Sequence, residues 1–239
     1  MAVHGDLSKY NEIQNSEYHF TLQNSKLLKA DLRHGPVQAR SGSMVAYQGD
    51  AQFENKGSGG IGKMLKKAAT GEGVPLMRVT GTGEVFLADT AQDIIVLYLE
   101  NDQVSVNGKN ILAFSASVEW DIQNIGGGVA GVMAGGLYNV VLRGTGFIAI
   151  MTEGTPVMLD VGSAPTSADP QAAVMWSAGV QMQMKKDTTG GLKSLARGGS
   201  GETFQMTFGG QGFVMVQPSE GPLIPQAGGG GGVLGSLGG

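Results

Sequence analysis

The sequence predicts an all-β protein with short helical inserts, folded as a single closed pseudo-threefold barrel or sandwich built from three internal repeats. Three observations lead to this fold class. A glycine phrase recurs as GTGEVFLA, GTGFIAIM and GQGFVMVQ, starting at residues 81, 144 and 210. A strand-like phrase precedes each glycine phrase with nearly the same period. A glycine-rich insert lies between the two phrases of every repeat.

The strand-like phrases are AYQGDAQF, AFSASVEW and MWSAGVQM, which start at residues 46, 113 and 175. Each carries an aromatic residue near its start, at Tyr47, Phe114 and Trp176. Polar and apolar residues alternate in SVEWDI and VQMQM, as expected of strands with one buried face. Two independent patterns with one period therefore indicate a threefold repeat.

The glycine phrases predict a second set of strands. The segments after the glycines are short, apolar and rich in aromatic and β-branched residues, which favours strands. Glycine within such a pattern usually marks a bulge or a corner where a sheet bends. We therefore expect a structural role for Gly81, Gly83, Gly144, Gly146, Gly210 and Gly212.

The inserts span residues 57–73, 126–136 and 189–201. Apolar residues at helical spacing predict one or two helical turns in each. These turns either cap the end of the barrel or form an exposed surface that contacts a protein or a membrane. The candidate interaction residues are Ile61, Met64, Leu65, Val129, Val132, Met133, Leu192 and Leu195.

The ends of the chain suggest how the barrel closes. Residues 36–49 are similar to residues 103–117, and the third repeat lacks such a stretch. An N-terminal piece that completes the last repeat would close the sheet without an exposed edge. The expected organisation is an N-terminal segment over 1–21, one three-repeat β domain over 22–225, and a flexible Gly-rich tail over 226–239.

Composition limits the class of protein. Hydrophobic residues make up 41% of the 239 residues and charged residues 15%, which suffices for a core. The absence of cysteine excludes a disulfide scaffold and thiolate metal sites. A net charge of −4 argues against nucleic-acid binding. No signal peptide or membrane-spanning run is recognisable, so we expect a cytoplasmic protein, with association at a membrane surface left open.

Motifs for catalysis or cofactor binding are not found. Each GxG precedes a strand rather than opening a helix, so a nucleotide site is not expected. The three histidines, His4, His19 and His34, share no helical turn or strand face. We expect solvated histidines, with a weak ion site as the alternative.

Acidic residues near the strand ends are the remaining candidates for chemistry. They would need to converge for acid–base catalysis, whereas solvated turn acids are far commoner. We therefore expect no catalytic residues, no cofactor and no metal site. The acids in question are Asp89, Asp93, Glu153 and Asp160.

The phrases GTGEVFLA and RGTGFIAIM, the strand ILAFSASVEWDI and the glycine-rich inserts resemble the Altered Inheritance of Mitochondria twenty-four family, in particular its bacterial uncharacterised-domain members. The resemblance covers most of residues 20–220. It implies a threefold pseudo-symmetric β fold like that of the tryptophan RNA-binding attenuation protein. In eukaryotes it also implies mitochondrial inner-membrane organisation. No catalytic residue set comes with it.

The leading hypothesis is a non-enzymatic scaffold that binds a protein partner or assembles with itself through the inserts. Peripheral membrane association through the same inserts is one alternative, because lysines and an arginine flank two of them. A small-ligand-binding or enzymatic barrel is the other alternative.

Overall fold

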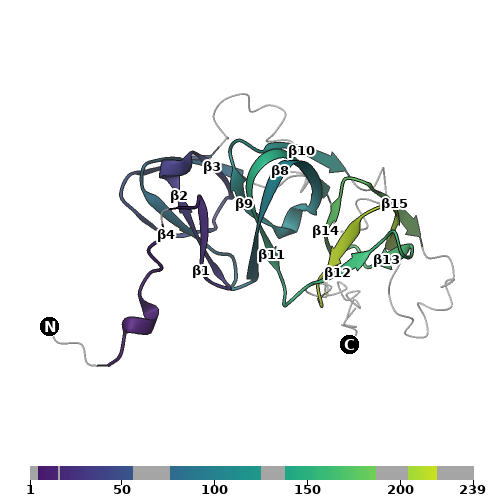
Figure 1. The fold of residues 1–239 in the computed structure, drawn as a ribbon, viewed down its shortest axis with the longest axis horizontal. Coiled ribbons are helices and arrows are strands. Elements are labelled where there is room, and N and C mark those ends of the chain that lie inside the picture. The colour runs from purple at the N-terminus through teal and green to yellow at the C-terminus, as the bar shows by residue number, and fades with distance from the viewer. Residues whose placement is uncertain (1–4, 16, 56–75, 125–137, 187–203, 220–239) are drawn as a thin grey trace, which may run out of the picture.

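The computed structural model of the protein describes residues 5–15, 17–55, 76–124, 138–186 and 204–219 (Figure 1). These residues form a four-stranded, a ten-stranded and a three-stranded sheet. The expected all-β class is therefore confirmed. Within the same residues, the helical elements are single 3-10 turns: η1 (Ser8–Tyr10), η2 (Leu32–His34) and η3 (Gly108–Asn110).

The strands fall into three consecutive segments, which we number by position in the chain. Segment one covers residues 27–87 and follows β1 (Phe20–Asn24), which pairs with its first strand. Its strands are β2 (Leu27–Asp31), β3 (Val37–Arg40), β4 (Met44–Gln48), β5 (Ala51–Asn55), β6 (Leu76–Gly81) and β7 (Glu84–Leu87).

Segment two covers residues 93–152 and segment three residues 157–216. The strands of segment two are β8 (Asp93–Asn107), β9 (Ile111–Ser115), β10 (Glu119–Asn124) and β11 (Tyr138–Thr152). Those of segment three are β12 (Val157–Asp160), β13 (Thr166–Ala168), β14 (Ala173–Ser177), β15 (Val180–Lys186), β16 (Phe204–Gly210) and β17 (Phe213–Val216).

Strands pair in the same way within each segment. β5 pairs with β6, β10 with the first half of β11, and β15 with β16. β4 pairs with β7, β9 with the second half of β11, and β14 with β17. Each pairing of this second kind skips one residue, which is Val45, Leu112 or Val174. These three residues therefore occupy equivalent bulge positions.

Antiparallel strand pairing joins neighbouring segments. β3 of segment one pairs with β9 of segment two, with Gln38 opposite Phe114. β8 of segment two pairs with β14 of segment three, with Ser105 opposite Trp176. The ten-stranded sheet therefore runs through both junctions, in the order β12-β17-β14-β8-β11-β9-β3-β6-β5 with β10 beside β11.

Each junction encloses a hydrophobic core. Leu28 and Val37 of segment one pack in the first core with Leu112 of segment two. The second core combines Val106 of segment two with Val174 of segment three. A third core surrounds Trp176 and Phe208 and contains residues of segment three alone. Only the first two cores are thus shared between segments.

The glycine phrases lie between the two halves of each segment. Gly81, Gly144 and Gly210 have φ angles of +130°, +104° and +98°, in the region that favours glycine. The β8–β11 ladder also shifts register between Gly144 and Gly146. The backbone thus bends at these positions as strands pass from one pairing partner to the next.

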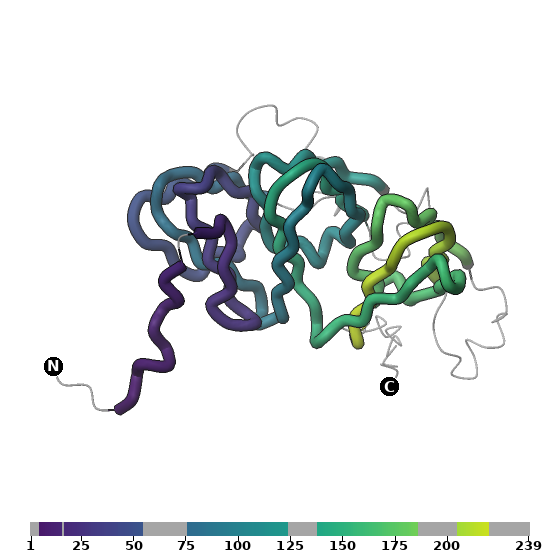
Figure 2. Tube along the Cα trace, viewed as in Figure 1, coloured from purple at the N-terminus to yellow at the C-terminus, as the bar shows by residue number. Residues whose placement is uncertain are grey.

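The predicted closure into a single barrel is wrong, because the sheets formed by the described residues are open. Residues 36–49 do not complete the third repeat. They contain β3 and β4, which pair with strands of segments one and two. Segments one and three therefore lie at opposite ends of the long axis (Figure 2). β1 starts at Phe20, before the predicted domain boundary, and the predicted tail lies outside the described residues.

Candidate functional site

The predicted interaction residues lie in the inserts, outside the described residues, although the strands beside each insert are described. Asn55 pairs with Met77, Asn124 with Tyr138, and Lys186 with Phe204. Each insert therefore starts and ends at neighbouring strand ends. The undescribed candidates are Ile61, Met64, Leu65, Val129, Val132, Met133, Leu192 and Leu195.

The edge strand β4 is the candidate interaction surface among the described residues. β4 is the last strand of its sheet, and its known strand neighbour is β7. Val45 is 58% exposed and Tyr47 is 51% exposed. Apolar and aromatic side chains thus lie beside backbone groups that are open to a further strand.

The equivalent strands of the other two segments are buried. Phe114 on β9 is 0% exposed and Trp176 on β14 is 3% exposed, at the position that Tyr47 has on β4. Leu112 and Val174 are fully buried at the position of Val45. The preceding segment supplies the cover, because β3 pairs with β9 and β8 pairs with β14. Among the described residues, β4 pairs with β7 alone and ends its sheet, so its other edge is open.

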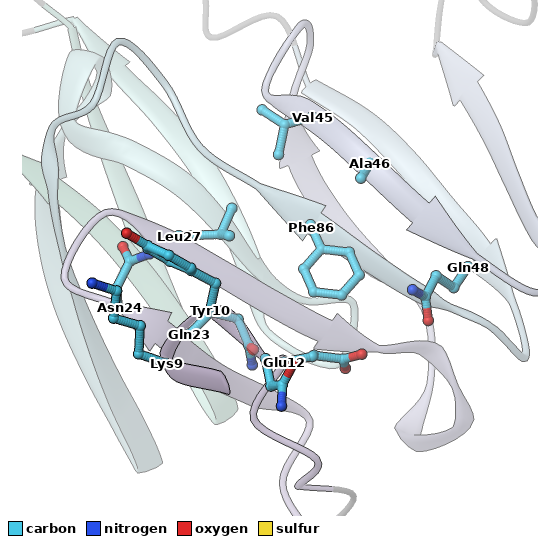
Figure 3. A pocket seen from close by; sticks show the side chains of 11 residues that line it. Lys9, Tyr10, Glu12, Gln23, Asn24, Leu27, Val45, Ala46, Gln48 and Phe86 are labelled. Atoms are coloured by element: carbon cyan, nitrogen blue, oxygen red, sulfur yellow. The ribbon is translucent and has the colours of Figure 1, made fainter. Parts of the chain in front are cut away.

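A groove of 560 Å³ lies beside this edge (Figure 3). Val45, Ala46 and Phe86 line it from the sheet, and Tyr10 and Glu12 line it from the N-terminal segment. The sheet side also includes the polar side chain of Gln48, and the N-terminal side includes the charged side chains of Lys9 and Glu12. Such a groove suits a segment of polypeptide with alternating apolar side chains.

A buried lysine ties the N-terminal segment to the sheet next to the groove. Lys29 on β2 is 1% exposed, and its Nζ lies 2.7 Å from Glu12 Oε1 and 3.3 Å from Glu84 Oε1. Burial by itself would lower the pKa of Lys29, but its hydrogen bonds to the two glutamates outweigh burial and raise the pKa. The lysine therefore stays charged and holds one wall of the groove in place.

A second ionic contact extends this cluster. Arg33 donates from Nη2 to Asp31 Oδ2 at 2.6 Å and from Nε to Asp31 Oδ1 at 2.8 Å. Burial would raise the pKa of Asp31, but the Arg33 hydrogen bonds outweigh it and keep the pKa low. Arg33 also reaches Glu84 at 3.2 Å. The four residues Lys29, Asp31, Arg33 and Glu84 are thus one network of alternating charge.

His19 contradicts the expectation of solvated histidines, because it is 7% exposed. Its Nε2 lies 3.1 Å from the Gly35 carbonyl oxygen, and its Nδ1 lies 3.0 Å from Ser115 Oγ. A carbonyl oxygen only accepts, so Nε2 donates to Gly35. In the neutral ring, Nδ1 then accepts from the Ser115 hydroxyl. His19 therefore connects the N-terminal strands to segment two. His4 lies outside the described residues.

We expect the fold to lose stability as the pH falls below about 6.5, the ordinary histidine pKa. Burial lowers the pKa of His19, with a further lowering by His34 and opposing contributions from Gly35 and Asp31. The unfolded chain therefore binds a proton at a pH where the folded chain does not, which favours unfolding. Urea midpoints at pH 7.5 and 5.5 should fall less in His19→Gln than in the parent chain. Equal falls would contradict this role of His19.

The four acidic candidates contact different partners. Asp89 lies 3.7 Å from Arg40, and Asp93 lies 3.1 Å from Lys26. Asp160 accepts a hydrogen bond from the Gly162 N–H in its own turn, whereas Glu153 accepts one from Gln92. Each acid thus has its own local partner. In the described parts of the chain, no cluster of three histidine or acidic residues is suited to a metal ion.

The sequence patterns did not predict the open edge of β4, although they did indicate which residues of the other two segments are equivalent to it. The alignment of Tyr47 with Phe114 and Trp176 shows that the three positions are equivalent. It does not show that Tyr47 lacks the covering segment.

Among the described residues, no helix is long and apolar enough to cross a membrane.

Comparisons with known proteins agree with this architecture. A protein-family model described as mitochondrial biogenesis AIM24 matches residues 18–219. Among solved structures, the chain is similar to the crystal structure of protein SPYM3_0169 from Streptococcus pyogenes, with a TM-score of 0.68 and 22% identity. That match covers 85% of this chain and 93% of the other, and it shows the fold alone. No curated protein matches the chain.

Proposed function

This chain belongs to the AIM24 family, and on that premise we propose that it is a non-enzymatic scaffold that docks a protein partner on the exposed edge of β4. One observation carries the proposal. Val45 and Tyr47 are exposed at strand positions whose equivalents in segments two and three are buried under a neighbouring strand. The edge of β4 therefore resembles the strand edges that pair at the two internal junctions, but no described strand pairs with it there.

The chemistry of β4 supports docking by strand addition. Its sequence, MVAYQ, contains no charged residue and no proline, the devices that usually protect an edge strand. A docked strand would pair with the open N–H and C=O groups and place alternate side chains against Val45 and the groove. The apolar side chains of Val45 and Phe86, which line the groove, would be removed from water in the process.

The three inserts give the scaffold a second set of contacts in this proposal. Each insert joins a pair of neighbouring strand ends in the described residues. We propose that these residues anchor a protein partner, and that the protein works in the cytoplasm. Contact with a membrane surface is the alternative role for the inserts. A small-ligand site would instead appear as ligand-dependent thermal stabilisation.

We also propose that the three segments are copies of one unit with a pseudo-threefold relation and the fold of the tryptophan RNA-binding attenuation protein. The recurrent pairings and the matching bulges at Val45, Leu112 and Val174 support this relation. An experimental structure in which residues 76–120 do not superpose on 138–182 would contradict it.

Photo-crosslinking in native cells tests the docking role. Tyr47 is replaced by a benzophenone amino acid, and Tyr98 on β8, 56% exposed, is replaced in the control chain. We expect a protein adduct from position 47 and none from position 98, because the proposed partner docks on β4 and Tyr98 lies on another strand. No adduct at position 47 would contradict docking on β4. A lipid adduct there would favour the membrane alternative.

A further inference from the structure

We propose that the strand that docks on β4 is β13 of a second copy of this chain, paired antiparallel with Ser167 opposite Tyr47. This inference rests on the docking role proposed for β4. The contact would be head-to-tail, because β4 and β13 belong to opposite ends of the molecule. It would repeat between copies the pairing that joins the segments within one copy.

The register follows from the two junctions inside the chain. At the first, Gln38 faces Phe114 across the junction and Arg78 within its own segment. At the second, Ser105 faces Trp176 across the junction and Val141 within its own segment.

Segment three contains the same arrangement with one partner missing. Ser167 on β13 faces Thr207 on β16, as Gln38 faces Arg78 on β6. The residue across the junction should be the equivalent of Phe114 and Trp176. In segment one that residue is Tyr47, so a second copy would provide the cross-junction strand partner that Ser167 lacks among the described residues of its own chain.

The three sheets support the same conclusion. Each internal junction joins three strands of one segment to three of the next, as in the order β5-β6-β3-β9-β11-β8. The order β15-β16-β13 at one end of the molecule matches the first half of such a junction. The order β4-β7-β2 at the other end matches the second half. The two separate sheets are therefore the two halves of a third junction.

The hydrophobic cores also support pairing with a second copy. Leu112 enters the core of segment one, and Val174 enters the core of segment two. Among the described residues, the core around Trp176 and Phe208 contains residues of segment three alone. Val45 is the equivalent of Leu112 and Val174 and is 58% exposed. Pairing between copies would bury it in the third core.

One difference indicates that the contact between copies is weaker than the internal junctions. Arg40 donates to the Ile111 carbonyl oxygen across the first junction, and Asn107 donates to the Ala173 carbonyl oxygen across the second. Asp169 holds the equivalent place after β13, and a carboxylate cannot donate. We therefore expect association that reverses on dilution. A head-to-tail contact builds a ring where the geometry closes and a filament where it does not.

Disulfide trapping tests the register, because the natural chain has no cysteine. Tyr47→Cys and Ser167→Cys are made in separate copies of the full chain, which are mixed and oxidised. Directly opposed residues on paired strands lie within the range of a disulfide. We expect a shift from the 24.6 kDa chain to a covalent dimer in the mixture and none in either variant alone.

Thr166→Cys mixed with Tyr47→Cys is the control, since a slip of one residue points the side chain to the other face. A dimer in Tyr47→Cys alone would overturn the proposal in favour of a symmetric β4–β4 contact. No dimer in the Tyr47→Cys and Ser167→Cys mixture would also overturn it. In that case a protein adduct in the photo-crosslinking experiment would preserve the docking role with another partner. Failure of both experiments would remove the docking role itself.

Discussion

Replacing Lys29 by methionine is expected to lower the free energy of unfolding by about 3 kcal/mol, at the low end of the range for breaking a buried ion pair. The lysine is 1% exposed, and its two carboxylate partners are 18% and 17% exposed. Without the ammonium group, Glu12 and Glu84 would lose their common counter-charge. The expected loss comes mainly from leaving these carboxylates poorly solvated beside each other.

Urea unfolding followed by tryptophan fluorescence measures this loss. Lys26→Met is the matched control, because Lys26 pairs with Asp93 at 3.1 Å but its side chain is 47% exposed. An exposed pair contributes at most about 1 kcal/mol. The raised pKa of Lys29 means that its contribution is present below the unfolded pKa of about 10.4 and fades as the pH rises through the folded pKa. Equal losses in the two variants would show that the Lys29 network does not stabilise the fold.

The second large effect is expected at a glycine phrase. Gly81 has φ +130°, and a Cβ atom there would lie 2.2 Å from the Asp50 carbonyl oxygen. Alanine would strain the backbone and also force apart the β5–β6 hairpin, in which Gly81 pairs with Ala51. We expect Gly81→Ala to lower the free energy of unfolding by about 2 kcal/mol or more.

Gly209→Ala provides the comparison within β16. A Cβ atom at Gly209 meets nothing within 4 Å. Its substitution should change the unfolding free energy by no more than about 0.5 kcal/mol. A Gly81→Ala chain as stable as Gly209→Ala would show that the bend at Gly81 tolerates a side chain.

The family and the strand content could both be predicted from short sequence patterns. The resemblance rested on the glycine phrases and on ILAFSASVEWDI, and the family match over residues 18–219 confirms it. Alternation in SVEWDI corresponds to β10, and the apolar segments after the glycines correspond to β7, β17 and the second half of β11. These features depend on local alternation and turn residues, which neighbouring positions in the chain determine.

The closed barrel was predicted wrongly because strand partners are not local. Residues 36–49 do resemble residues 103–117, and the structure gives β3 the pairing role that the end of β8 has. The similar stretches thus have corresponding strand pairings. The similarity could not tell which neighbour each strand would pair with, because each edge of a strand carries the same backbone groups whatever its sequence.

The sequence by itself determined the family, the all-β class and the equivalence of Tyr47, Phe114 and Trp176. Only the tertiary structure decided that His19 is buried and that β4 is left open beside a groove. The physical reason is that a side chain's burial depends on what packs against it from distant parts of the chain. Tyr47 has the same local pattern as Phe114, but β3 pairs beside Phe114, whereas no strand among the described residues pairs beside Tyr47 in that way.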